Sequence, residues 1–521
     1  MKSKKMVWAL ICLAVAGCQV IGLGTPGAPP EASPLAKQTQ APTSVPPARH
    51  TEPAPTQTAQ DTRLPIPPTE PVSTPVPEEI RFYHLRIEYS TSSDWSTLEV
   101  LNAETILSAR LAALEGSPSA YEAQPRHLSL NQTLESAEVG HVVGMSVDYA
   151  FAAQAGEQGV DFLLQKGALY GSTVRIYALA AGEKKLIKQV SHQKVVKADP
   201  GLNPLRFSLD AQAFEAVALE TAQLERPGIA KMVWAFYYPW YHTNEWSSPI
   251  LKDRPAVPYA SDDQRAIARQ IQQAQTAGID GFISSWWGPG DYTDQNLAAL
   301  LELAETSGFR VMIYFETLTD NGPRDSDEIQ RWLEYFIPRY GEHPALMRIE
   351  GKPVIVVWAS GTVPLETWQE VFTNLRSKGL EAEYLAMGYN LANLEVFDGL
   401  HEYGIFTLPG LAGTYQSVGR AVRYYGLLDE PPRPRLWVAT VQPGYDDRLI
   451  PGRDGLVQER EQGGYYRSTF AAALQSDPDW IFITTWNEWW EHTYIEPSEL
   501  YGDLYLQITQ EYAARWKSLG R

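Results

Sequence analysis

Residues 281–316 read GFISSWWGPGDYTDQNLAALLELAETSGFRVMIYFE, and this stretch is the clearest guide to the fold. It begins with an apolar run at 281–286, continues through an amphipathic stretch at 294–307, and ends in a second apolar run at 310–316. Short apolar runs joined by one amphipathic stretch are typical of a strand, a helix and a second, parallel strand, since both faces of a parallel sheet are covered.

The same alternation continues from about Met232 to the end of the chain. Eight apolar runs are expected to be strands: 232–238, 281–286, 310–316, 353–358, 383–387, a poorly marked run at 404–408, 435–441 and 480–485. Helical stretches lie between most of them, at 262–277, 294–307, 327–340, 365–377, 465–475 and 500–519. Eight such units predict an α/β fold, a (β/α)8 TIM barrel, over residues 229–521.

Residues 80–228 have a different pattern, with short alternating segments separated by Gly, Ser, Asn and Asp. The expected strands are 82–89, 96–101, 143–149, 173–179 and 185–195. This spacing predicts a β-sandwich-like accessory domain before the barrel. It either binds sugar or serves as a structural spacer, and the single tryptophan, Trp95, favours the spacer.

The first residues have the layout of an export signal, with lysines among residues 2–5, an apolar run at 6–15 and then small residues. The run is too short to span a bilayer. Residues 15–18, Val-Ala-Gly-Cys, resemble a bacterial lipobox, so we expect residues 1–17 to be removed and Cys18 to carry a lipid. The alternative is a plain secretory signal with an incidental cysteine. The prediction is an exported protein, anchored by lipid to a bacterial cell membrane and facing outside the cytoplasm.

Residues 18–79 read as a stalk. Between Thr25 and Pro77 there are 15 prolines among 53 residues, interleaved with Ala, Thr, Gln and Ser. Such a segment cannot bury enough apolar surface to fold and favours extended polyproline II. At ~3 Å per residue it would reach roughly 150 Å from a membrane.

Charge and cysteine content exclude several partners. The net charge is −19, and removing three lysines with the signal takes it to −22, which opposes binding to nucleic acid or to anionic lipid headgroups. The two cysteines are Cys12 and Cys18, so no disulfide is expected after cleavage of the signal. A neutral or cationic partner fits better, with membrane contact through the anchor only.

The expected strand ends carry aromatic and acidic residues, and in a TIM barrel these ends form the functional face. Of 16 tryptophans, 14 lie at or after Trp234, and indole rings stack well on sugars. Those that follow strand ends are candidates for sugar contact: Trp240, Trp286, Trp287, Trp489 and Trp490. Six others are expected to fill the core instead: Trp234, Trp332, Trp358, Trp368, Trp437 and Trp516.

Glu488 and Glu491 are the candidate catalytic pair. They are three residues apart just after the last strand, so both side chains can address one cleft. Glycoside cleavage needs two carboxyl groups, one to protonate the departing oxygen and one to act as base or nucleophile. Two solvated loop glutamates would be the ordinary interpretation of an isolated ExxE, but here tryptophans flank both.

Glu316 closes an apolar run, where a charge is costly unless it emerges into a cleft and finds partners. We interpret it as an acceptor for substrate hydroxyls or a third carboxylate, with a structural ion pair as the alternative. The histidines form no metal-binding spacing, and there is no phosphate loop, dinucleotide motif or GxSxG. No metal and no cofactor are therefore expected.

Seven ordered motifs between residues 230 and 500 resemble glycoside hydrolase family 99, the endo-α-mannosidases and endo-α-1,2-mannanases. They are FYYPWY (236–241), SWWG (285–288), YFE (314–316), GKPV (351–354), PGYDD (443–447), GGYY (463–466) and NEWWEHTYIE (487–496). The region before the barrel lies outside the resemblance. The resemblance implies a retaining, endo-acting hydrolase without metal, acting on α-mannose-containing oligosaccharides, polysaccharides or glycoprotein glycans.

The implied mechanism uses the substrate's own 2-hydroxyl, which attacks the anomeric carbon to give a 1,2-anhydro sugar. Glu488 would be the base for that hydroxyl, and Glu491 the acid for the leaving oxygen and then the base for water. Glu316, Trp287 and Tyr238 match family positions that line the sugar site, and Tyr415 is a candidate for another. Together with the residues at the strand ends, the predicted substrate-binding residues around the pair are Tyr238, Trp240, Trp286, Trp287, Glu316, Tyr415, Tyr445, Asp446, Asn487, Trp489, Trp490, His492 and Glu496.

Three residues depart from the family pattern beside the second glutamate. Trp490 and His492 stand where His and Gly are usual, and Tyr494 stands where Gln is usual. Bulky residues here would reshape the neighbouring subsites or change the acid's pKa. Two other functions therefore stay open: a retaining glycosidase of different linkage specificity that uses a glutamate as conventional nucleophile, and a glycan-binding lipoprotein without activity.

Overall fold

The computed structural model describes residues 80–101, 106–154, 160–167, 170–180, 183–193, 204–209, 229–319, 321–429, 433–453 and 455–519. The predicted signal, the lipidation site Cys18 and the predicted stalk lie outside the described residues. Among the helices described, none is long and apolar enough to cross a membrane.

The β-rich region consists of two antiparallel sheets. One has the order β3-β6-β1-β8-β9, formed by Ile106–Glu115, Val143–Gln154, Ile80–Thr91, Ser172–Ala180 and Glu183–His192. The other has the order β10-β7-β2-β5-β4, formed by Leu205–Leu209, Val160–Lys166, Trp95–Val100, His127–Asn131 and Ala120–Gln124. A short helix, α1 (Leu134–Glu138), follows β5.

Alternating burial along the strands explains why these sheets face each other. In β7 every second residue is buried, so one face, with Phe162 and Leu164, is apolar. Those side chains join Leu85 and Ile87 of β1 and Val147 of β6 in a single hydrophobic cluster, so the two sheets share one core. This is the arrangement of a sandwich, as the spacing of the turn residues predicts.

The barrel has eight parallel strands. They are β11 (Met232–Tyr237), β12 (Gly281–Trp286), β13 (Arg310–Phe315), β17 (Lys352–Val357), β18 (Glu383–Met387), β19 (Gly399–His401), β20 (Leu436–Val441) and β23 (Trp480–Ile483). Pairing runs in sequence order from β11 to β20, continues through β23 back to β11, and thereby closes the sheet. The predicted fold is confirmed.

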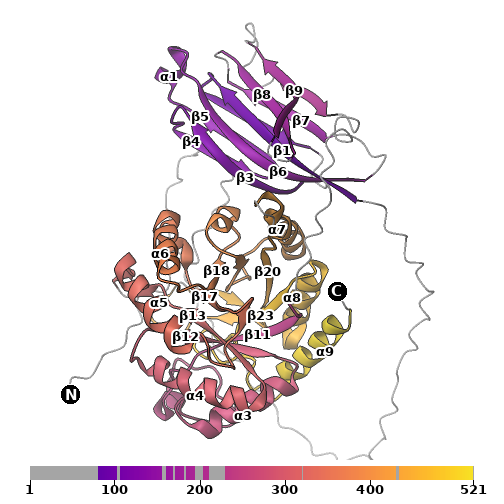
Figure 1. The fold of residues 1–521 in the computed structure, drawn as a ribbon. Coiled ribbons are helices and arrows are strands. Elements are labelled where there is room, and N and C mark those ends of the chain that lie inside the picture. The colour runs from indigo at the N-terminus through magenta and orange to yellow at the C-terminus, as the bar shows by residue number, and fades with distance from the viewer. Residues whose placement is uncertain are drawn as a thin grey trace, which may run out of the picture. The chain divides into compact units, whose positions relative to one another are not determined.

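Helices surround the barrel strands (Figure 1). They are α3 (Gln264–Thr276), α4 (Tyr292–Ser307), α5 (Ser326–Tyr340), α6 (Leu365–Ser377), α7 (Leu411–Tyr425), α8 (Gly464–Gln475) and α9 (Leu504–Ser518). The sequence pattern indicates all of these except α7. A 3-10 helix, η6 (Leu391–Glu395), stands between β18 and β19.

The loops that connect the barrel strands and helices contain further short strands, isolated β-bridges and 3-10 helices. The strands are β14 (Leu318–Thr319), β15 (Gly322–Pro323), β16 (Arg348–Ile349), β21 (Tyr445–Asp446) and β22 (Val457–Gln458). The 3-10 helices are η4 (Thr243–Ser247), η5 (Ser360–Thr362), η7 (Gly426–Leu428) and η8 (Glu461–Gly463).

The sixth strand was placed wrongly by the sequence pattern. The expected run at 404–408 lies in a loop, and the strand is the three-residue β19, Gly399–His401. It contains a buried histidine, whose ring packs against Phe236 and Phe482 inside the barrel. A strand of three residues that includes glycine and histidine has too little apolar character to stand out from the sequence.

Barrel residues alternate between two cores. Side chains such as Phe236 and Phe482 point into the barrel and form an inner cluster, whereas Tyr237 and Ile483 point outward and pack under the helices. Because both faces are covered, β12 is buried at all six positions. The inner cluster continues into aromatic residues beyond the strand ends, and there the packing gives way to a pocket.

Candidate active site

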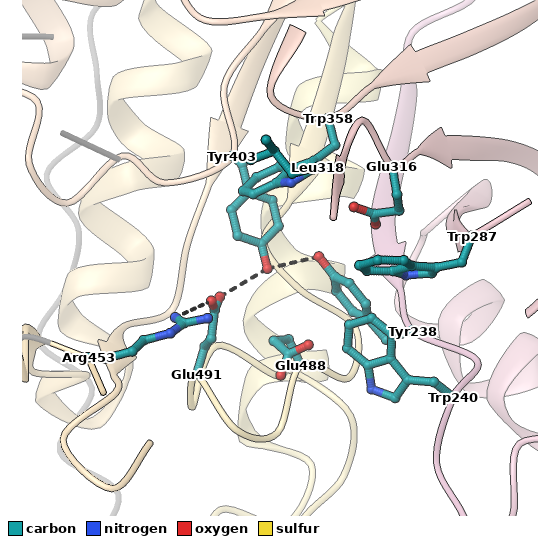
Figure 2. A pocket seen from close by; sticks show the side chains of 10 residues that line it. All are labelled: Tyr238, Trp240, Trp287, Glu316, Leu318, Trp358, Tyr403, Arg453, Glu488 and Glu491. Carbon is teal, nitrogen blue, oxygen red and sulfur yellow. Dashed lines mark hydrogen bonds and ion pairs between the residues drawn. The ribbon is translucent and has the colours of Figure 1, made fainter. Parts of the chain in front are cut away.

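The pocket lies at the carboxyl ends of the barrel strands, where Figure 2 shows its lining. Ten residues form its wall: Tyr238, Trp240, Trp287, Glu316, Leu318, Trp358, Tyr403, Arg453, Glu488 and Glu491. Its empty volume of about 480 Å³ includes the part that is open to solvent. The combination of apolar aromatic walls with three carboxyl groups suits a sugar, which presents both C–H faces and hydroxyls.

Hydrogen bonds within its own loop hold both the backbone and the carboxyl group of Glu488. Its own amide donates to Oγ1 of Thr485 at 2.8 Å, and its Oε1 accepts from the amide of Trp490 at 3.2 Å. The residue before it, Asn487, accepts from the amide of Tyr238 at 2.7 Å and donates to the same residue's carbonyl at 3.0 Å. The last strand and the first strand of the barrel are thereby joined directly beside the carboxyl group.

Burial raises the pKa of the Glu488 carboxyl well above its ordinary value, and the nearby Glu491 raises this pKa further. Arg453 and two backbone amides act in the opposite direction. Glu488 is 4% exposed and Glu491 is 8% exposed, so their mutual repulsion is weakly screened.

Glu491 differs from Glu488 in having a cationic partner. Arg453 donates from Nη1 to Oε1 of Glu491 at 2.6 Å, and the hydroxyl of Tyr403 donates to Oε2 at 3.1 Å. The Tyr403 hydroxyl in turn accepts from that of Tyr238 at 3.0 Å. Figure 2 shows this chain of contacts crossing the pocket from Arg453 to Tyr238. Both oxygens of Glu491 are therefore fixed.

Glu316 is the third carboxyl group of the pocket. It follows β13, is 4% exposed, and accepts from Oγ of Ser285 at 2.6 Å. Ser285 Oγ also accepts from Nε1 of Trp287 at 3.1 Å, so the carboxyl and this indole share one anchor. Burial raises the pKa of Glu316 to about 8, an effect that Ser285 and then Arg324 reduce. At neutral pH Glu316 is largely a neutral carboxylic acid, able to donate as well as accept.

Four large side chains form the apolar part of the wall. Trp240 and Trp287 stand on the side of Tyr238, while Trp358 and Leu318 cover the side of Tyr403, as Figure 2 shows. Trp358 was expected to fill the core, and it does belong to the buried inner cluster. Because it directly follows β17, it also reaches the pocket.

Trp286 and Tyr415 do not line the pocket, so the prediction that they contact substrate is wrong. Both are 0% exposed and pack in the outer core, under the helices. Trp286 donates from Nε1 to Asp294 at 2.9 Å, and Tyr415 donates from its hydroxyl to the carbonyl of Thr440 at 2.6 Å. Trp286 is the last residue of β12, and alternation turns it outward while Trp287 turns inward.

Two predicted binding residues, Trp489 and Glu496, lie behind the pocket wall. Glu496 accepts from Nε2 of Gln270 at 2.6 Å, from the hydroxyl of Tyr259 at 3.0 Å and from Nε1 of Trp489 at 3.2 Å. Burial raises its pKa to about 7. Tyr259 also accepts from the Asn487 side chain at 3.1 Å, so this cluster braces the loop that carries Glu488.

The residues that depart from the family pattern take up positions next to the pocket wall. Trp490 stacks on Trp240 with ring centroids 5.8 Å apart, and so affects the pocket through that indole. His492 has φ 55°, in the left-handed region that favours the glycine usual there. Burial lowers the pKa of His492 to about 3, so the ring is neutral, and it packs beside Tyr494 at 5.3 Å.

Tyr445 and Asp446, also predicted to bind substrate, belong to β21 behind Arg453. The Tyr445 hydroxyl accepts from Arg453 at 2.9 Å and donates to Asp447 at 2.9 Å. Asp446 accepts from Arg448 at 2.6 Å and forms an ion pair with Lys252. Both are buried and contact the pocket only through other side chains.

Sequence reasoning missed four lining residues: Leu318, Trp358, Tyr403 and Arg453. Tyr403 follows the strand that the pattern misplaced, and correct placement of β19 would have found it. Arg453 lies in the connection between β21 and β22, where no periodicity exists to indicate its direction. In the part of the chain that the structure describes, no group of three or more His, Cys, Asp or Glu is placed to hold a metal.

Comparisons with known proteins identify relatives of the barrel region. Residues 255–513 match the model of glycosyl hydrolase family 99. The glycoprotein endo-alpha-1,2-mannosidase of Rattus norvegicus is 26% identical over 361 residues, which span 56% of this chain and 76% of that protein. The protein of the same name from Mus musculus is 26% identical over 369 residues, 58% of this chain and 78% of its own length.

Among solved structures, the GH99 endo-alpha-mannosidase from Bacteroides thetaiotaomicron is 23% identical, with a TM-score of 0.48. That similarity covers 56% of this chain and 98% of the other. Eight of the ten lining residues fall inside the matched range 255–513, and only Tyr238 and Trp240 precede it.

Proposed function

The barrel of this chain belongs to glycosyl hydrolase family 99 and the chain is a glycoside hydrolase, and from this premise we propose that it cleaves α-mannosidic linkages within glycans, with retention of anomeric configuration. One observation carries the proposal: Glu488 and Glu491 both open into a single aromatic-walled pocket at the strand ends of the barrel. The names of the curated relatives, which are endo-alpha-1,2-mannosidases, support the substrate class.

In the proposed first step, the 2-hydroxyl oxygen forms a bond to the anomeric carbon as the glycosidic bond breaks. Glu488 accepts the hydroxyl proton, and Glu491 donates a proton to the departing oxygen. In the second step, water attacks the anomeric carbon of the 1,2-anhydro sugar. Glu491 accepts a proton from that water, and Glu488 returns its proton to the 2-oxygen, so both groups end as they began.

This route makes a stereochemical demand on the substrate. The 2-hydroxyl has to lie trans to the leaving group, as it does in α-mannosides and does not in α-glucosides. Glu316 and Trp287, which share Ser285 as an anchor, are suited to hold hydroxyls and a ring face beside the reacting sugar. The proposal therefore predicts that α-glucans are not cleaved.

The proposed first step starts with Glu488 ionised and Glu491 protonated. Burial and the neighbouring Glu491 raise the pKa of Glu488, whereas Arg453 lowers it, so Arg453 favours the ionised Glu488 that this step needs.

Product release from a panel of α-mannans and mannose-containing glycans tests the proposal. The intact protein is expected to release oligosaccharides rather than mannose alone, and α-glucans in the same panel should stay intact. Glu491→Gln is the control, because it keeps the shape of the side chain and removes its proton. Release of the same products by this variant, or of nothing from any α-mannoside by the intact protein, would contradict the proposal.

Trapping experiments distinguish the proposed route from a conventional glutamate nucleophile. A covalent sugar ester on Glu488 or Glu491, detected by mass spectrometry of quenched reactions, would count against the anhydro sugar and for the conventional route. Free 1,2-anhydro sugar accepted as a substrate would support the proposed one.

The same proposal places the enzyme outside the cytoplasm, on a lipid anchor at Cys18. It is supported by the lysines and apolar run of residues 2–15 and by the Val-Ala-Gly-Cys sequence at 15–18. Incorporation of labelled fatty acid into the full chain, and its loss in Cys18→Ala, is the expected result. Labelling that persists in this variant would contradict the anchor.

A further inference from the structure

We propose that Arg453 is the positioning residue of the catalytic pair: it orients the Glu491 carboxylate and sets the pH range in which Glu488 and Glu491 together carry one proton. The inference rests on the proposed function, in which that single proton is required. It concerns a residue outside every motif that identified the site.

The contacts of Arg453 are specific. Its side chain is 6% exposed and lines the pocket, where Nη1 donates to Glu491 Oε1 at 2.6 Å and to the Tyr445 hydroxyl at 2.9 Å. Asp447 lies 3.9 Å away and accepts from the Tyr445 hydroxyl, so one guanidinium stands between two carboxylates. The backbone is fixed as well, because the Asp446 amide donates to the Glu491 carbonyl at 2.9 Å.

Titratable groups from several elements lie near Glu491. Tyr403 follows β19, Tyr238 follows β11, Tyr445 belongs to β21 and Glu488 follows β23. Three of these are phenols, whose pKa burial raises, so they stay neutral. Of the ten residues that line the described pocket, Arg453 is the one with a permanent positive charge.

A fixed positive charge beside two carboxyl groups makes both easier to ionise. Arg453 lowers the pKa of Glu488 against the effects of burial and of Glu491. Without Arg453, the pair would hold its protons to higher pH, whichever carboxyl carries the first one. The sign of this effect therefore does not depend on how the proton is divided between the two groups.

The first test measures kcat/KM against pH for the full chain, for Arg453→Gln and for Arg453→Lys. The acidic and the basic limb of the kcat/KM profile both reflect ionisation of the Glu488 and Glu491 pair in the free enzyme. Both limbs are expected to move to higher pH by about one unit or more in Arg453→Gln. Arg453→Lys keeps the charge and should restore the wild-type limbs, with a lower maximum because one ammonium replaces the planar fork.

Arg448→Gln is the matched control. It removes a second arginine from the same connection, but Arg448 is 54% exposed and pairs with Asp446 instead of the catalytic pair. Both limbs of the kcat/KM profile of this variant should coincide with those of the wild type. A merely structural role for Arg453 would lower the maximum of kcat/KM in Arg453→Gln and leave both limbs in place, and that result would overturn the inference.

A second readout needs no activity. The infrared absorbance of protonated carboxyl groups, taken as the difference between the wild-type protein and Glu488→Gln, isolates the titration of Glu488. The midpoint should rise by about one unit or more when the same difference is measured in the Arg453→Gln background. An unchanged midpoint overturns the inference even if the substrate is still unknown, whereas failure on every α-mannoside overturns only the proposed function.

Discussion

Glu488 and Glu491 are both buried, yet they meet different surroundings. Glu488 accepts from a backbone amide and faces a like charge, whereas Glu491 is paired with Arg453 and Tyr403. Two identical side chains thus meet different environments in one pocket, which is the arrangement that the proposed acid and base roles require.

Replacing either glutamate with glutamine should abolish most of the activity without harming the fold. Loss of a general acid or base lowers kcat by roughly 10²–10⁴-fold. Glu488→Gln also replaces a carboxyl group that burial makes costly to ionise with a neutral amide, so its thermal midpoint should equal or exceed that of the wild type. A variant that keeps more than a tenth of wild-type kcat/KM would show that its glutamate is not part of the chemistry.

Tyr403 is expected to matter through its single hydrogen bond to Glu491. A hydrogen bond to a charged group contributes about 1.5–3 kcal/mol, so Tyr403→Phe should lower kcat/KM by roughly 10- to 100-fold. Tyr314→Phe is the control, because its hydroxyl contacts Met387 and His401 below the pocket. Equal losses in the two variants would mean that the effect is general packing.

Ionisation of the buried Glu316 should lower the stability of the folded protein as the pH rises. Its pKa in the folded protein is about 8, above the ordinary value of 4.5, so its contribution to stability is complete below pH 4.5 and is lost as the pH rises to 8. Glu316→Gln cannot ionise and still accepts from Ser285. The variant should therefore gain stability relative to wild type between these pH values, by about 3–5 kcal/mol in unfolding experiments.

Sequence reasoning found the residues that directly follow well-marked strands. Glu316, Trp287 and Glu488 are of this kind, since a strand ending predicts which face its next residues address. Arg453 could not be found in this way, because the direction of a side chain in a long connection depends on contacts such as that with Tyr445.

Helix α7 is the barrel helix that the sequence pattern did not indicate. It contains Gly413 and Gly419, and glycine weakens any expectation of a helix. The structure explains one of them: a Cβ at Gly419 would lie 2.5 Å from Nε1 of Trp437, which is fully buried beneath the helix. Packing against the barrel, absent from any local pattern, decides that this segment is helical.

These two glycines offer a matched pair of substitutions. Gly413→Ala places its Cβ in open space and should stabilise the protein by about 0.4–1 kcal/mol. Gly419→Ala forces the buried indole to shift and should destabilise it by about 1–3 kcal/mol. Thermal unfolding of the two variants checks both signs, and a stabilising Gly419→Ala would contradict the described packing of α7 on β20.

For the whole molecule, composition and periodicity separated a β-rich region from a barrel and indicated the class of each. Seven of the eight barrel strands followed from apolar runs, because burial on both faces leaves a strong signal. The sandwich was harder. Strands such as β4 and β10 carry mixed, partly exposed side chains, and only pairing with β5 and β7 identifies them.

We propose that Glu488 and Glu491 cleave α-mannosides internally with retention. The most direct test follows the first product by proton NMR, on whichever α-mannan the panel identifies, before the reducing end equilibrates. We expect an oligosaccharide whose new reducing end appears first as the α-anomer. A β-anomer as the first product, or mannose released from the chain end, would contradict it.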